Sequence, residues 1–198
     1  MEKVFKGFKS AAVFLLFLGI SFIAVETSSA MVLFYENFED GVLDPKAAVT
    51  TTGSFSSEPG IKDLTDFGSE KAFGFGRSVC GASCFENYKT TFDITFDSPV
   101  FVTALSFKDK ELFGNWGSQG FIYLDGIAFN PTSNGYVFSR NPVNDRVADT
   151  AYREYEFDIN QELLKISFKV TDITTASEVF IDDILVKGSG TTAVPEPA

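Results

Sequence analysis

The chain contains no histidine among its 198 residues, and this absence removes whole classes of catalytic and metal-binding site. Ser-His-Asp and Cys-His catalysis both need an imidazole that accepts a proton near neutral pH. Metal centres built on histidine ligands are excluded for the same reason. The sequence also lacks a nucleophile elbow, a phosphate-binding loop and a dinucleotide fingerprint. An enzyme would therefore have to rest on carboxylates, as in glycoside hydrolysis.

No apolar run reaches the roughly 20 residues that a membrane-spanning helix needs. The longest one, residues 11–25, follows Lys3, Lys6 and Lys9 and precedes Thr-Ser-Ser-Ala at 27–30. A basic start, a short apolar run and a small-residue cleavage site are the layout of a secretory signal peptide. We therefore predict a signal peptide at residues 1–30 and an exported protein after it. The alternative, an N-terminal membrane anchor, is disfavoured by the short run.

Basic residues are scarce: 16 Lys and Arg stand against 27 Asp and Glu, for a net charge of −11. Removing residues 1–30 takes away three lysines and two glutamates, which leaves 13 basic and 25 acidic residues and a charge of −12. Such a surface would repel a phosphate backbone, so we predict no nucleic-acid partner. The acidity suits solubility and cation binding.

Cysteine occurs twice, at Cys80 and Cys84, with Gly-Ala-Ser between the two. In an exported chain this pair is expected to form a disulfide, which by loop entropy would contribute about 2 kcal/mol. Two free thiols are one alternative. A two-thiol metal site is another, but tetrahedral zinc would need further Cys or His ligands.

The region after residue 30 has no convincing amphipathic helix, whereas strand patterns recur with turn residues between them. This favours an all-β fold, an antiparallel β-sandwich of the jelly-roll kind, over residues 31–188. Val32, Phe34 and Phe38 are predicted to share one face, and the 23 phenylalanines predict an aromatic core. Another face is predicted to hold Leu164, Ile166, Phe168 and Val170. The expected strands are 32–38, 47–52, 71–75, 91–97, 100–108, 120–129, 136–139, 152–159, 163–170 and 177–186.

The last strand carries two adjacent carboxylates, Asp182 and Asp183, within an otherwise apolar stretch. Strict alternation would place the two on opposite faces, each among apolar neighbours. An unpaired carboxylate there would cost several kcal/mol. The sequence leaves open whether the pair is exposed at a sheet edge or held by a cation or a hydrogen-bond network.

The C-terminal stretch 189–198 reads as a flexible linker that ends in Val194, Pro195, Glu196 and Pro197. This end resembles the Val-Pro-Glu-Pro sorting signal of bacterial PEP-CTERM proteins. The resemblance implies recognition by an exosortase and association with the cell surface or an extracellular polysaccharide matrix. In that family a membrane helix and a basic cluster follow the motif. Here the chain stops at Ala198, so we expect a shortened gene or an expressed fragment whose membrane segment is missing.

A second resemblance covers most of the exported region. Phe38-Glu39-Asp40-Gly41 and Phe180-Ile181-Asp182-Asp183-Ile184 are similar to the opening and closing strands of jelly-roll carbohydrate-binding modules. The resemblance implies a structural Ca²⁺ held by Glu39 and by Asp182 or Asp183, together with backbone carbonyls. Ca²⁺ takes about 6 to 8 oxygen ligands, so such a site would fasten the two ends of the domain together. Exposed acidic turns, or salt bridges to Lys187 or Arg77, are the alternatives.

A sugar site usually combines an exposed aromatic ring with hydrogen-bonding side chains. The only tryptophan, Trp116, lies in a glycine-rich loop, and we predict a ligand site at Trp116, Asn115, Gln119, Tyr123 and Asp125. The alternative is a tryptophan folded onto the core. The polar loop 139–146 is a second possible rim or an ordinary solvated turn.

Three functions remain, and the sequence does not separate them. The first is an exported, non-catalytic protein that binds extracellular polysaccharide or forms part of the matrix. The second is a structural or adhesive surface protein without a small ligand. The third, a polysaccharide-active enzyme, would need two carboxylates facing each other about 5 to 9.5 Å apart, and nothing in the sequence selects such a pair.

Overall fold

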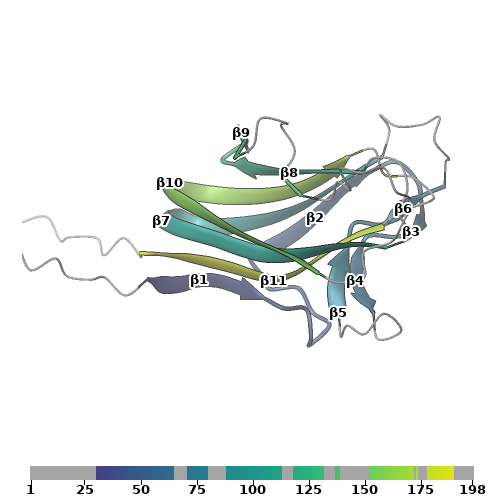
Figure 1. The fold of residues 1–198 in the computed structure, drawn as a ribbon, viewed down its shortest axis with the longest axis horizontal. Coiled ribbons are helices and arrows are strands. Elements are labelled where there is room, and N and C mark those ends of the chain that lie inside the picture. Colours follow the sequence, from purple (N-terminus) through teal and green to yellow (C-terminus); the bar gives the residue numbers. More distant parts are fainter. Residues whose placement is uncertain are drawn as a thin grey trace, which may run out of the picture.

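The structure, a computed structural model, describes residues 30–64, 71–79, 88–112, 118–131, 137–138, 152–171, 173 and 178–189. Within these residues all regular structure is β and every strand pairing is antiparallel, which confirms the predicted all-β sandwich (Figure 1). The described part of the chain has no helix that is long and apolar enough to cross a membrane.

The described strands form one large sheet, which folds over, and one small two-stranded sheet of β3 and β6. In chain order they are β1 (Met31–Glu36), β2 (Ala47–Thr52), β3 (Phe55–Ser57), β4 (Gly60–Asp63), β5 (Lys71–Gly74), β6 (Arg77–Ser78), β7 (Lys89–Leu112), β8 (Gln119–Leu124), β9 (Ile127–Phe129), β10 (Arg153–Thr171) and β11 (Glu178–Ser189).

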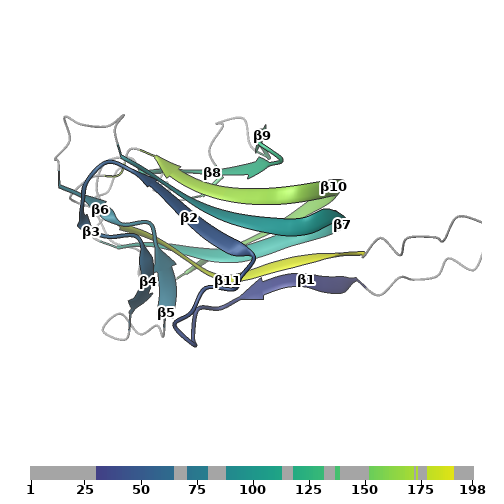
Figure 2. The same cartoon turned by 180° about the vertical axis from the view of Figure 1, so that it is seen from behind.

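Two very long strands, β7 and β10, pair along nearly their whole length, from Arg153 opposite Asp109 to Val170 opposite Thr90. The register shifts in the middle of this ribbon, and Asn160 has a φ of 53° there. Figures 1 and 2 show both strands doubling back at one end of the molecule, so that each contributes to two layers. The sequence predicted four separate strands here, at 91–97, 100–108, 152–159 and 163–170, with Ser-Pro at 98–99 as the break in the first pair.

The two layers are defined by what each half of the ribbon pairs with. The β8 layer contains β2, the first half of β7, the second half of β10, β8 and β9. The β11 layer contains the second half of β7, the first half of β10, β11, β1, β5 and β4. The centre of this β11 layer is therefore β11 beside β7, with β1 and β10 on either side.

The core lies between the layers and is rich in phenylalanine, as predicted. The Phe168 ring of the β8 layer meets the Phe107 ring of the β11 layer edge-on, with 5.0 Å between centroids. Phe38, Phe73 and Phe92 form a second group of ring contacts. Each fully buried side chain of this size contributes about 1.5 to 3 kcal/mol of hydrophobic free energy, so these rings hold the layers together.

Two predicted faces are wrong in detail, and β-bulges are the reason. Leu164 is 45 % exposed whereas Leu163 is buried, because the register of β10 shifts between Leu163 and Lys165. Val32 is 55 % exposed, although Phe34 and Phe38 are buried as predicted, because the register of β1 shifts between Val32 and Phe34. An extra residue in a strand moves the side chains that follow to the other face.

The first and last described strands lie side by side, with Met31 opposite Gly188. The chain therefore enters the described sandwich through β1 and leaves it through β11 at the same end of the molecule, where β7 and β10 double back (Figures 1 and 2). The predicted signal peptide up to residue 29, the cysteines Cys80 and Cys84, and residues 190–198 with the sorting motif lie outside the described residues.

Candidate functional site

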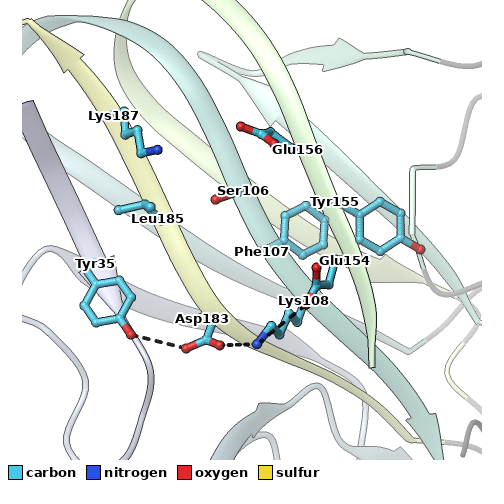
Figure 3. A pocket seen from close by; sticks show the side chains of 10 residues that line it. All are labelled: Tyr35, Ser106, Phe107, Lys108, Glu154, Tyr155, Glu156, Asp183, Leu185 and Lys187. Carbon is cyan, nitrogen blue, oxygen red and sulfur yellow. Dashed lines mark hydrogen bonds and ion pairs between the residues drawn. The ribbon is translucent and has the colours of Figure 1, made fainter. Parts of the chain in front are cut away.

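The outer face of the β11 layer carries a groove of about 550 Å³, here named the Tyr35 groove (Figure 3). It crosses four neighbouring strands, β1, β11, β7 and β10. The residues that line it are Tyr35, Ser106, Phe107, Lys108, Glu154, Tyr155, Glu156, Asp183, Leu185 and Lys187.

The strand register explains why these side chains meet. Tyr35 lies opposite Leu185, which lies opposite Ser106, which in turn lies opposite Glu156. Because side chains alternate along a strand and Leu105 and Phe107 belong to the core, Ser106 and Lys108 point outward. The small Ser106 side chain leaves a hollow between the half-exposed Tyr35 ring on one edge and the glutamates of β10 on the other.

A chain of polar contacts crosses one end of the groove. The Lys108 ammonium lies 2.7 Å from Asp183 Oδ2 and 3.9 Å from Glu154 Oε1. The Tyr35 hydroxyl donates to Asp183 Oδ1 at 3.3 Å. The hydrogen bond to Asp183 raises the pKa of Lys108, and partial burial, with the charge of Asp183, raises the pKa of Tyr35. Near neutral pH the groove therefore presents an ammonium, a phenol and carboxylates in fixed positions.

The prediction that Asp182 and Asp183 lie on opposite faces is wrong. The register of β11 against β7 shifts between Asp182 and Leu185, and Asp183 has a φ of 49°. The core-facing residues are Val179 and Ile181 before this bulge and Ile184 and Val186 after it. Both carboxylates are thereby turned away from the core.

Asp182 is nevertheless half-buried, and its pKa is raised to about 7. Burial is the main cause, and the charges of Asp183 and Glu39 add to it. The Asp183 backbone N–H donates to Asp182 Oδ1 at 2.7 Å and partly offsets this effect. A cation bound beside Asp182 would stabilise the charged form of this carboxyl group.

The predicted calcium ligands have unequal surroundings. Glu39 Oε1 accepts a hydrogen bond from the Lys71 backbone N–H at 3.0 Å, and the negative charge of Glu39 raises the pKa of Asp182. Asp183 is already paired with Lys108. Among the described residues, no three His, Cys, Asp or Glu side chains form a group that could hold a metal by themselves. Glu39 and Asp182 fit a Ca²⁺ ion better than Asp183 does, and backbone carbonyls would have to supply the remaining ligands.

Comparisons with known proteins bear on the fold. No protein-family model matches the chain, and a search among curated proteins found no match either. Among solved structures, the chain is similar to the K1 and K3 cleaved adhesin domains of Lys-gingipain from Porphyromonas gingivalis. The TM-scores are 0.55 and 0.52 at 13 % and 12 % identity, and both matches cover 79 % of this chain and 98 % of the domain. The fold is that of these adhesin domains.

A third solved structure, TmCBM61 in complex with β-1,4-galactotriose, covers 78 % of this chain and 95 % of its own at 13 % identity. Its TM-score is 0.46.

None of the described residues of the ligand site predicted from the sequence lines the Tyr35 groove. Trp116 and Asn115 lie outside the described residues. Gln119 and Tyr123 lie on β8, in the other layer. Asp125 forms the turn after β8, where its carboxylate accepts the backbone N–H groups of Leu164 and Lys165.

Sequence reasoning singled out Asp183 and Lys187, for other roles, and missed the other residues that line the groove. Alternation could have marked Tyr35, Ser106 and Lys108 as outward-facing, because each lies next to residues of the core. These three side chains lie close together only because β1, β11, β7 and β10 are neighbours in that order. Alternation within a strand does not predict the order of the strands. The salt-bridge alternative named Arg77 as a partner for these carboxylates, but its guanidinium lies 3.4 Å from Glu178 instead.

Proposed function

We propose that the chain is an exported, non-catalytic protein that binds a polysaccharide in the Tyr35 groove. The observation that carries this proposal is a groove with one half-exposed aromatic ring and a row of fixed hydrogen-bonding groups on the outer face of a β-sandwich. Sugar rings have apolar C–H faces that pack on aromatic rings and hydroxyls that pair with carboxylates and ammonium groups.

The contacts within the groove support binding more than catalysis. Asp183 lies at one end of the groove and already accepts hydrogen bonds from Lys108 and Tyr35. Two such partners hold the carboxylate in place, so that it can accept a hydrogen bond from a sugar hydroxyl. A glycosidase acid must instead deliver a proton to the leaving oxygen.

The setting that we propose is the cell surface or an extracellular matrix. The signal peptide predicted at residues 1–30 and the motif at Val194, Pro195, Glu196 and Pro197 support export and exosortase sorting. Since β1 and β11 leave the sandwich at one end, a chain anchored through its C-terminal segment would be tethered there. The β3, β4, β5 and β6 end would then point away from the anchor.

The test is a binding screen of the purified chain against neutral and charged polysaccharides, repeated with two groove variants. Tyr35→Ala removes the aromatic ring, and Ser106→Trp fills the hollow. Ile127→Ala on β9, which removes a 75 % exposed side chain outside the groove, is the control. We expect a polysaccharide that binds the wild type and the control and loses at least tenfold in affinity with both groove variants, about 1.4 kcal/mol.

Equal binding by wild type and both groove variants would place the ligand elsewhere. Cleavage of the bound polysaccharide would show an enzyme. If no polysaccharide binds at all, the structural or adhesive surface protein becomes the better account.

A further inference from the structure

A second hollow, of about 290 Å³, lies on the outer face of the β8 layer, on the opposite side of the sandwich from the Tyr35 groove. It is here named the Tyr123 hollow. Strands β2, β7, β10 and β8 and the turn after β8 contribute to it. Its lining residues are Thr50, Thr91, Asp93, Tyr123, Gly126, Lys165, Ser167 and Lys169.

Register again explains the arrangement. Ser167 lies opposite Asp93 on one side and opposite Tyr123 on the other, while Thr91 lies between Thr50 and Lys169. The intervening residues of these strands, such as Ile166 and Phe168, belong to the core. The lining side chains of these strands therefore point outward from a rigid sheet.

The aromatic part of this surface is a pair of rings on β8. The Tyr123 ring lies 6.5 Å from that of Phe121, and both side chains are half-buried. The Lys169 ammonium lies over the Tyr123 ring, 5.5 Å from its centroid. A ring with an ammonium beside it can take the apolar face of a sugar and an anionic substituent of the same sugar.

The charge of this hollow differs in sign from that of the Tyr35 groove. Its lining has two lysines and one carboxylate, whereas the groove has two lysines and three carboxylates. The single carboxylate, Asp93, is occupied: it accepts the Ser167 hydroxyl and lies 3.6 Å from the Lys165 ammonium. In a chain with a net charge of −11, the Tyr123 hollow is thus a local excess of positive charge.

We propose that the Tyr123 hollow is a second binding site, specific for an acidic polysaccharide that carries carboxylates on its sugars. Lys169 and Lys165 pair with the carboxylates, the Tyr123 ring packs on a sugar face, and the threonine hydroxyls bond to ring hydroxyls. A nucleic acid is the poorer fit, because duplex DNA carries one negative charge per roughly 1.7 Å and the acidic chain would repel it. The site goes beyond the proposed function, and its test does not depend on the Tyr35 groove.

If both sites are occupied, the protein bridges two polysaccharide chains, since the layers face away from each other. Such bridging would join the polysaccharide bound in the Tyr35 groove to an acidic polysaccharide within one matrix. Two sites on one rigid sandwich would also raise the apparent affinity for a mixed polysaccharide network.

The experiment compares binding of the purified chain to polygalacturonate and to the same polymer with its carboxylates methyl-esterified. The variants are Tyr123→Ala and the double variant Lys165→Gln with Lys169→Gln. A charge-matched control, Lys46→Gln with Lys62→Gln, removes two lysines that line neither the Tyr123 hollow nor the Tyr35 groove. Lys165→Arg with Lys169→Arg keeps both charges, and unfolding midpoints establish that each variant is folded.

We expect the wild type to prefer polygalacturonate over its ester and to lose affinity as salt is added. The Lys→Gln double variant should bind about tenfold more weakly, since each exposed charge contact contributes modestly. The control and the Lys→Arg variant should keep the affinity, and so should Tyr35→Ala. The proposal is overturned if polygalacturonate does not bind, if the ester binds equally well, or if the control loses as much as the double variant. It is also overturned if duplex DNA binds as tightly, or if Tyr35→Ala abolishes the binding.

Discussion

Asp182 is the residue whose ionisation the fold changes most clearly, from an ordinary pKa of 3.8 to about 7. Below pH 3.8 the carboxyl is protonated in both the folded and the unfolded chain. Between pH 3.8 and about 7 the unfolded chain gives up this proton first, so the folded state loses stability as the pH rises. The stability that protonated Asp182 contributes is therefore present below pH 3.8 and lost by about pH 7.

Asp182→Asn should remove this pH dependence, because the amide stays neutral and can still accept the Asp183 N–H. We expect the variant to unfold at a higher urea concentration than wild type at pH 8 and at about the same concentration at pH 4. The measurement is urea unfolding in EDTA at both pH values. A variant that is less stable than wild type at pH 8 would show that the Asp182 carboxylate has a partner cation even in EDTA.

Bound calcium should offset the loss of stability that the charged Asp182 carboxylate causes above pH 7. If Glu39 and Asp182 hold a Ca²⁺ ion, added calcium raises the thermal unfolding midpoint above its value in EDTA. We expect Glu39→Ala and Asp182→Ala to lose this rise. Asp183→Ala should keep most of it, since Lys108 already pairs with Asp183. If calcium does not change the unfolding midpoint of the wild type, Glu39, Asp182 and Asp183 do not form a calcium site and only repel one another.

At the scale of the elements, register shifts break the regular alternation of the strands. They include the shift between Val32 and Phe34 in β1, the bulge at Asp182 and Asp183 in β11, and the shifts at Asn160 and beside Leu164 in β10. A residue other than glycine with φ near +53° costs about 1 kcal/mol, less for asparagine than for most.

Substitutions at Asn160 test whether this conformation shapes the ribbon. Asn160→Gly should leave the free energy of unfolding within about 0.5 kcal/mol of wild type, because glycine adopts positive φ readily. Asn160→Val should cost about 1 to 2 kcal/mol, since a β-branched side chain disfavours that region. Asp158→Val, two residues earlier and exposed, is the matched control. Equal effects at positions 158 and 160 would contradict a role for the φ of Asn160.

These bulges mark the limit of what the sequence could predict. The strand predicted at 47–52 is present, and alternation correctly identified the core positions Ile166, Phe168 and Val170. It failed for Leu164 and the Asp182–Asp183 pair, because a bulge is set by the partner strand. It also could not predict that β7 and β10 each continue from one layer into the other as one folded ribbon.

At the scale of the whole molecule, the fold brings distant segments together at each outer face. The Tyr35 groove joins β1 to strands more than 60 residues later in the chain. The site predicted from the sequence, centred on Trp116, was instead chosen from residues that are close together in the chain. The outer faces instead depend on the order of strands across each layer, which the folded ribbon sets.

The most direct test of the central proposal is to map which backbone amides change when the polysaccharide binds. The measurement is a titration of the isotope-labelled chain, followed by NMR amide shifts, with an oligosaccharide of the best-binding neutral polysaccharide. We expect the shifts to concentrate on β1, β11, β7 and β10, around Tyr35, Ser106, Lys108 and Leu185, and to saturate together. Shifts confined to other surfaces, or no shift at millimolar oligosaccharide, would contradict the Tyr35 groove as the binding site.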